Sequence, residues 1–161
     1  MNLPRRTCAA MAGAVTLAAA TPQALAQGAP AGCTVVPSST WINVIVEGVR
    51  SGSGLVTVTL YADESRRFLA KGGSLQVGRV KAVAGSTRVC ITVPQPGTYA
   101  LAIYHDENGN QKIDRTGIGL PAEGYGFSNN PSTLAGLPAF SSVRLAIPRA
   151  GLASRVRMKY P

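Results

Sequence analysis

Residues 105–130 concentrate the side chains of this chain that could do chemistry. The segment holds the only histidine, His105, and four of the seven acidic residues of the sequence. Within it, four oxygen-bearing side chains follow one another at short spacing: Asp106, Asn108, Asn110 and Asp114. This spacing lets short side chains converge on one point of a tight loop, as a hard cation requires. The segment therefore has two interpretations: a set of Asx turns that bond only their own backbone, which we favour, and a calcium site.

Comparison with an EF-hand loop shows where the calcium pattern is incomplete. With Asp106 as the first ligand, the other three oxygen-bearing side chains fall on EF-hand ligand positions. Gln111, however, occupies the position of the EF-hand glycine, and Gly117 stands where the bidentate glutamate belongs. We therefore expect calcium to bind with an affinity on the order of millimolar, unless Glu107 or Glu123 supplies a further carboxylate.

A catalytic interpretation of the segment depends on His105. A general base needs an acid that orients it and a group that it activates. Asp106 follows directly, so in an extended strand its side chain points to the opposite face. Ser128 lacks the G-x-S-x-G context of a serine nucleophile. We therefore favour a structural histidine and a protein that is not an enzyme, and a hydrolase that uses His105 with loop carboxylates is the alternative.

The second half of the segment alternates glycines with aromatic residues, in the sequence EGYGF from Glu123 to Phe127. Glycines beside aromatic residues permit unusual backbone angles while the rings pack against the fold. Tyr125 and Phe127 could anchor a long loop, or they could contact a ligand such as a sugar or an apolar chain. The candidate ligand-binding or loop-building residues are His105, Glu107, Glu123, Tyr125, Phe127 and Asn129.

Alternating apolar residues from Thr40 onward predict the strands that must position this segment. About seven short strands are expected, near residues 42–46, 56–60, 75–83, 87–93, 98–104, 143–147 and 156–160. We expect the first two to pair as a hairpin, because a Ser-Gly-Ser-Gly turn separates them at residues 51–54. The run at 98–104 is apolar on both faces, so it should be a central strand that is covered on both sides.

This pattern predicts an all-β chain with a single β-sandwich domain at residues 40–161. The expected type is immunoglobulin-like or transthyretin-like, with one long loop after the central strand. Residues 63–71 are the only stretch with helical composition and should form a short helix or an ordered loop. The last strand should be half-buried with a basic outer face.

The first 26 residues have the features of a signal peptide. Arg5 and Arg6 form a positive start, residues 8–20 are apolar, and Ala24-Leu-Ala26 fits the cleavage rule. We expect residues 27–39 to be a flexible leader, and the mature protein to be periplasmic or extracellular without a transmembrane segment.

Removal of the signal peptide leaves two cysteines, Cys33 and Cys90. An even pair in an oxidising compartment predicts a disulfide, with two buried thiols as the alternative. Cys90 shares the polar face of its expected strand. The disulfide should therefore fix the leader across the outside of a sheet.

The charge of the chain bears on its partners. Sixteen Lys and Arg residues less Arg5 and Arg6 leave 14 against 7 acids, so the mature chain is about +7. The basic residues are dispersed and no nucleic-acid motif is present, so we expect no specific nucleic-acid binding. An anionic envelope polymer or a surface protein is the plausible partner.

The pattern H-D-x-N-x-N-x-x-x-D, followed by G-x-P-x-E-G-Y-G-F-S-N-N, resembles an uncharacterised family of secreted bacterial proteins known as domain of unknown function 2141. The resemblance covers roughly Trp41 to Tyr160 and implies no activity, because the function of the family is not established. More loosely, the P-G-x-Y strand that leads into D-x-N-x-N is similar to prealbumin-like repeat domains of bacterial surface adhesins, some of which bind calcium.

Together these observations predict a secreted or periplasmic, non-catalytic binding or envelope-associated module. Calcium is the candidate cofactor, as a stabiliser of the loop at residues 105–130. The alternatives are the hydrolase that uses His105 and a structural partner of an outer-membrane assembly.

Overall fold

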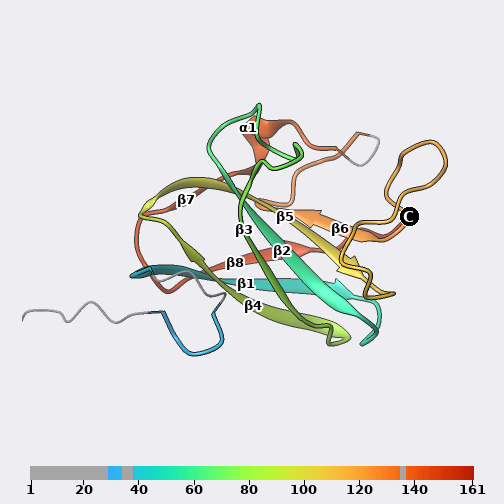
Figure 1. Ribbon diagram of the computed structural model, residues 1–161, viewed down its shortest axis with the longest axis horizontal. Helices are drawn as coiled ribbons and strands as arrows, with labels where there is room; N and C mark the ends of the chain where they lie inside the picture. Colours follow the sequence, from blue (N-terminus) through green and yellow to red (C-terminus); the bar gives the residue numbers. More distant parts are fainter. Residues whose placement is uncertain (1–28, 34–37, 135–136) are drawn as a thin grey trace, which may run out of the picture.

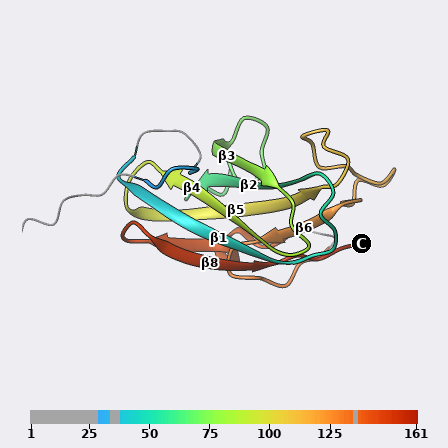
Figure 2. The same ribbon diagram turned by 90° about the horizontal axis from the view of Figure 1, so that it is seen from below.

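Two β-sheets pack face to face in the computed structural model of the chain, which describes residues 29–33, 38–134 and 137–161. The predicted signal peptide lies outside these residues. The smaller sheet has the order β4–β1–β8, with β1 at Thr40–Val49, β4 at Gly85–Val93 and β8 at Leu152–Arg157. The larger sheet has the order β3–β2–β5–β6, with β2 at Leu55–Ala62, β3 at Ser74–Lys81, β5 at Gly97–Asp106 and β6 at Gly124–Phe127. Figure 1 shows both sheets in face view, and Figure 2 shows them stacked one above the other.

The all-β sandwich that the sequence predicts is thus confirmed. Side chains alternate across each strand, so every second residue enters the space between the sheets. The resulting core is aliphatic and almost fully buried, and its main members are Ile42, Val44, Val46, Val56, Val58, Leu60, Val89, Ile91, Leu101 and Ile103.

The hairpin predicted for the first two strands is wrong. β1 pairs with β4 and, in parallel, with β8, whereas β2 pairs with β3 and β5 in the other sheet. Residues 50–54 therefore cross from one sheet to the other. Gly54 has a φ of +66°, and a Cβ there would overlap the carbonyl oxygen of Asp106, so the crossing requires glycine at this position.

β5 is the central strand, as predicted. It pairs with β2 along one edge, and β6 and β7 (Arg144–Ile147) lie one after the other along its opposite edge. Its inner face joins the main core. Its outer face is covered by a second apolar cluster that includes Tyr61, Ala100, Phe127 and Val143.

Two connections complete the outer cover of the larger sheet. Residues 63–71 form a series of turns, which is the ordered loop among the two predicted alternatives, and Phe68 from this loop packs against Tyr61 and Phe127. A short helix that the sequence pattern did not predict, α1 (Phe140–Val143), adds Phe140 to the same cluster.

The remaining predictions on the fold concern its edges. A disulfide joins Cys33 to Cys90, and Cys90 is partly exposed on the outer side of β4, as predicted. β8 buries Val156 and exposes Arg155 and Arg157, which confirms its basic outer face. Among the described residues, no helix has the length and apolar character needed to cross a bilayer.

Candidate functional site

The segment at residues 105–130 is not a loop throughout, because Gly124–Phe127 forms β6 and pairs with β5. Its two glycines face the smaller sheet, where a Cβ on Gly124 would overlap the Tyr160 ring and one on Gly126 would lie 2.8 Å from Val156 Cγ1. Tyr125 and Phe127 therefore face outward. Tyr125 also bridges to Lys159 near the C-terminus, which Figure 1 shows beside β6. The alternation of glycine with aromatic residues lets the two sheets approach closely at this edge.

His105 is fully buried on the inner face of β5. Its Nε2 lies 2.9 Å from the carbonyl oxygen of Ser53, and its Nδ1 lies 2.8 Å from the hydroxyl of Tyr160. A carbonyl only accepts, so Nε2 carries a hydrogen and donates it to Ser53, while Nδ1 is the partner of the Tyr160 hydroxyl. The Tyr160 oxygen in turn accepts the amide hydrogen of Arg50 at 3.0 Å. Through its two ring nitrogens, His105 thus links residues 50–54, which cross between the sheets, to the C-terminal residues.

Glu107 lies close to His105 but is paired elsewhere. Its Oε1 is 4.0 Å from His105 Nδ1, beyond hydrogen-bond distance. The carboxylate instead accepts two bonds from the Arg50 guanidinium and one from the Ser51 hydroxyl. The bonds from Arg50 hold the pKa of Glu107 below its usual value. The Arg50 guanidinium also lies over the Tyr160 ring, 4.6 Å from its centroid.

The four predicted calcium ligands come together in one small loop. Asp106 is fully buried, and its carboxylate accepts the amide hydrogens of Asn110 at 3.0 Å and Gln111 at 2.7 Å. Gln111 has a φ of +62°, so it adopts the left-handed conformation that the EF-hand glycine supplies. Asp114 accepts the side-chain amides of Asn108 and Asn110 at 2.7 and 3.0 Å.

This arrangement is a set of Asx turns. The amide oxygens of Asn108 and Asn110 accept backbone hydrogens of the same loop, from Asn110 and Lys112 respectively. Within the described residues, no group of three or more histidine, cysteine or acidic side chains is placed so that it could hold a metal ion. Calcium binding therefore stays a prediction that would require the two asparagine amides to turn.

Glu123 connects this loop to β6. It is only 5% exposed, and its two carboxylate oxygens accept the amide hydrogens of Glu107 and Asp114, each at 3.1 Å. Burial raises the pKa of Glu123, the two amide bonds oppose the rise, and the charges of Asp114 and Asp106 add to it. The carboxylate thus fastens the start and the middle of the segment to each other.

The Ser-Asn-Asn end of the segment makes similar bonds to its surroundings. The buried Ser128 hydroxyl accepts the amide hydrogen of Leu101 at 3.0 Å and donates to the carbonyl of Val143. Asn129 and Asn130 have φ values of +64° and +50°. The Asn129 amide donates to the carbonyls of Ser142 and Arg144, and the Asn130 side chain bonds the backbone of Arg155 and Arg157.

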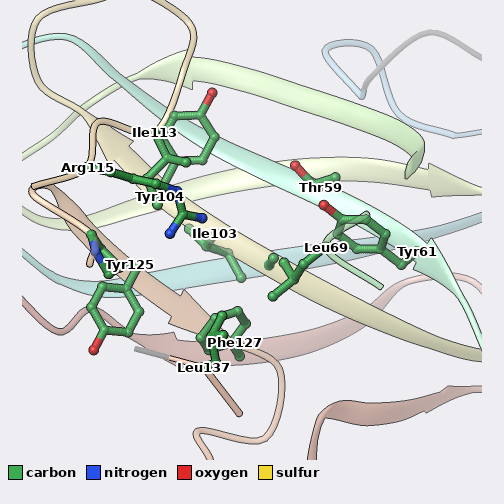
Figure 3. A pocket seen from close by; sticks show the side chains of 12 residues that line it. Thr59, Tyr61, Leu69, Ile103, Tyr104, Ile113, Arg115, Tyr125, Phe127 and Leu137 are labelled. Atoms are coloured by element: carbon green, nitrogen blue, oxygen red, sulfur yellow. The ribbon is translucent and has the colours of Figure 1, made fainter. Parts of the chain in front are cut away.

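A pocket opens on the outer face of the larger sheet, above β2, β5 and β6 (Figure 3). We call it the outer pocket. It contains about 550 Å³ of empty space when the part open to solvent is included, and it is lined by Thr59, Tyr61, Leu69, Ala102, Ile103, Tyr104, Ile113, Arg115, Pro121, Tyr125, Phe127 and Leu137. Tyr125 and Phe127 are the two candidate ligand-binding residues that line it.

The predicted site residues thus separate into two groups. His105, Glu107, Glu123 and Asn129 bond the protein's own groups, whereas Tyr125 and Phe127 face the outer pocket. Three of the other lining residues, Ile113, Arg115 and Pro121, belong to the segment at 105–130 but were not predicted as site residues. The rest come from distant segments that only the fold brings together. The one available signal is alternation, which places Tyr104 on the face of β5 opposite His105.

Comparison with known proteins identifies one family. A family model described as "Uncharacterized protein conserved in bacteria (DUF2141)" matches residues 44–153, a range that contains the whole segment at 105–130. No curated protein and no solved structure matches the chain significantly. The looser similarity to prealbumin-like adhesin repeats therefore stays a prediction.

Proposed function

Since the chain belongs to the DUF2141 family of uncharacterized bacterial proteins, we propose that it is an exported, non-catalytic binding module that holds a small apolar ligand in the outer pocket. The observation that carries this proposal is the position of the pocket. Tyr125 and Phe127 form part of its wall, and the segment that presents them is fastened by the side chains of Glu123 and Ser128. A wall that is held in place before binding lowers the entropic cost of holding a ligand.

The lining of the outer pocket supports an apolar ligand. Most of its side chains are aliphatic or aromatic, as in small-molecule sites generally. Two of them, Leu69 and Leu137, are 39% and 53% exposed. Large apolar side chains that stay exposed around a hollow commonly mark a binding site.

The same lining supports a binding role over catalysis. Among the described residues, those that line the pocket include no histidine, cysteine, serine or carboxylate. His105 is on the opposite face of β5, so the hydrolase alternative would require it to leave its bonds to Ser53 and Tyr160. No contact among the described residues favours that alternative or a structural role in an outer-membrane assembly.

Export rests on two features. The disulfide between Cys33 and Cys90 fits an oxidising compartment, and the first 26 residues have the pattern of a signal peptide. We place the protein in the periplasm or outside the cell. Detection of the chain in a periplasmic or secreted fraction, with an N-terminus at Gln27, would test this part of the proposal.

The binding proposal is tested by filling the outer pocket. Ala102 lies on its floor between β2 and β6, so Ala102→Phe places a ring in the hollow and removes no existing hydrogen bond. Titration with two aromatic probes, neutral naphthamide and anionic naphthoate, should show saturable binding that Ala102→Phe weakens by about tenfold or more, equivalent to about 1.4 kcal/mol.

The matched control is Ala153→Phe, which adds the same ring at an exposed position of β8 in the smaller sheet. It should bind both probes as the wild type does. If neither probe binds the wild type, or if Ala102→Phe binds as tightly as Ala153→Phe, the outer pocket is not the binding site and the proposal fails.

Calcium is a second candidate ligand. It would stabilise the loop that contains Asp106 and Asp114, and it would not occupy the outer pocket. The observation that favours it is Gln111, whose left-handed backbone supplies the sharp turn that an EF-hand obtains from glycine. We expect millimolar calcium to raise the unfolding temperature relative to a chelator, and Asp114→Asn to abolish the rise. Equal unfolding temperatures with calcium and with the chelator would leave the four side chains as Asx turns only.

A further inference from the structure

Arg115 places a positive charge in the otherwise uncharged lining of the outer pocket. It is exposed, forms an isolated bridge with Pro121, and donates from Nη1 to the carbonyl of Gly119 at 2.8 Å. Figure 3 shows its guanidinium within the ring of lining side chains, on the side of Tyr104 and Tyr125. A guanidinium has five N–H donors, so this one bond leaves most of them available.

Within the described part of the chain, no carboxylate forms an ion pair with Arg115. All seven acidic residues lie in the described part of the chain. Three of them form ion pairs with other arginines, namely Glu47 with Arg155, Asp63 with Arg144 and Glu107 with Arg50. Asp106, Asp114 and Glu123 accept amide hydrogens within the segment at 105–130. Glu64, the seventh, does not pair with Arg115 among the described residues either.

We infer that the ligand of the outer pocket is a small apolar carboxylate, whose apolar body lies against Tyr125 and Phe127 and whose carboxylate pairs with Arg115. This inference rests on the proposed function and specifies the ligand class. Arginine binds a carboxylate through two parallel hydrogen bonds, which position the ligand as well as hold it. Arg115 is exposed, so solvent screens the charge, and the geometry of the two bonds contributes more to recognition than the charge alone.

The charge of the whole chain favours the same ligand class. Without the predicted signal peptide, 14 basic residues stand against 7 acidic ones, so the net charge is about +7. Such an excess attracts anions and raises their rate of association, and the effect falls with ionic strength. An anionic ligand would therefore be attracted before it contacts Arg115.

The test compares naphthoate with naphthamide, which share the ring system and differ in charge. We expect the wild type to bind naphthoate more tightly than naphthamide, by about threefold, as expected for one exposed ion pair. Arg115→Met keeps an unbranched apolar stem and removes the charge together with the bond to Gly119, so it should bind both probes equally. Arg115→Lys should retain part of the preference, since the charge remains but the two-pronged geometry is lost.

The control variant is Arg88→Gln, which removes an exposed charge from β4 on the smaller sheet. It should keep the full preference for naphthoate. Retained binding of naphthamide by Arg115→Met would show that its pocket is intact. Equal binding of both probes by the wild type, or an unchanged preference in Arg115→Met, overturns the inference and leaves the proposed function standing. Absence of binding by both probes overturns the proposed function itself.

Discussion

The two faces of β5 and β6 use the same segment of chain in different ways. On the inner face, His105 is fully buried and bonded through both nitrogens, and Gly126 admits Val156 from the smaller sheet. On the outer face, Tyr104 and Tyr125 are partly exposed and line a pocket. The residue types that suggest catalysis thus support the fold, and the partly exposed Tyr104 and Tyr125 of the pocket lining are aromatic.

This difference gives a physical reason for the polar residues of the segment. A chain that leaves the central strand and returns as β6 has many backbone groups without a strand partner, and such groups need hydrogen bonds when they are buried. Asp106, Glu123 and Ser128 each bond backbone amides of other residues. Side-chain oxygens here take the place of a neighbouring strand.

The largest expected effect comes from crowding the inner face. Gly126→Ala would bring a Cβ within 2.8 Å of Val156 Cγ1 and 2.9 Å of the Arg157 carbonyl oxygen, so the sheets must separate locally. We expect a loss of about 1–3 kcal/mol in the free energy of unfolding, measured with urea. Gly117→Ala is the control, because its added Cβ meets nothing within 4 Å. Equal stabilities of the two variants would show that the close approach at β6 is unimportant.

A smaller loss is expected from removing one of the side-chain bonds. Ser128→Ala leaves the buried amide of Leu101 and the carbonyl of Val143 without the hydroxyl that bonds them, at a cost of about 1–2 kcal/mol. Ser132→Ala, at an exposed position of the same connection, should have no measurable effect. The account of the Ser-Asn-Asn end would be contradicted if both alanine variants unfolded at the same urea concentration.

The smallest effects should appear in the pH dependence of stability, and they should have opposite signs at two glutamates. The folded-state pKa of Glu107 is lowered by Arg50, so its contribution is present above its unfolded value, about 4.3, and is lost as the pH falls. The pKa of Glu123 is raised by burial, so its contribution is greatest below that value and is lost as the pH rises through the folded pKa.

Thermal unfolding of Glu107→Gln and Glu123→Gln between about pH 3 and pH 7 measures this contrast. The stability of the wild type relative to Glu107→Gln should fall as the pH falls. Its stability relative to Glu123→Gln should increase over the same range. Curves of the same slope for the two variants would mean that the two carboxylates have similar surroundings, contrary to the structure.

Alternation accounts for what the sequence could predict of the fold. β1 alternates apolar and other residues, β5 is apolar on both faces, and both were predicted close to their observed positions. The pairing of β1 was not predicted correctly. Alternation is the same for two strands that are neighbours in one sheet and for two strands that face each other across the core, so it does not distinguish these arrangements. β6 was also missed, since its inner positions are Gly124 and Gly126 where a strand pattern requires apolar side chains.

The candidate site was predictable only in part, for a similar reason. The segment at 105–130 was identified from its composition, and Tyr125 and Phe127 were among its candidate ligand-binding residues. Most of their partners in the outer pocket come from β2, β5, the turns after β2 and the connection before α1, and three come from the segment itself. These contacts depend on long-range pairing, which residue spacing does not reveal. Arg115 was not predicted, because a single arginine in a polar loop has no distinguishing pattern.

The most direct test of the central claim is the location of a bound probe by nuclear Overhauser effects between naphthamide or naphthoate and the labelled protein. The account predicts contacts from the probe ring to the Ala102 methyl group and to the rings of Tyr104, Tyr125 and Phe127. Contacts confined to residues of the smaller sheet, such as Trp41, would contradict it and would place binding on the opposite face of the sandwich.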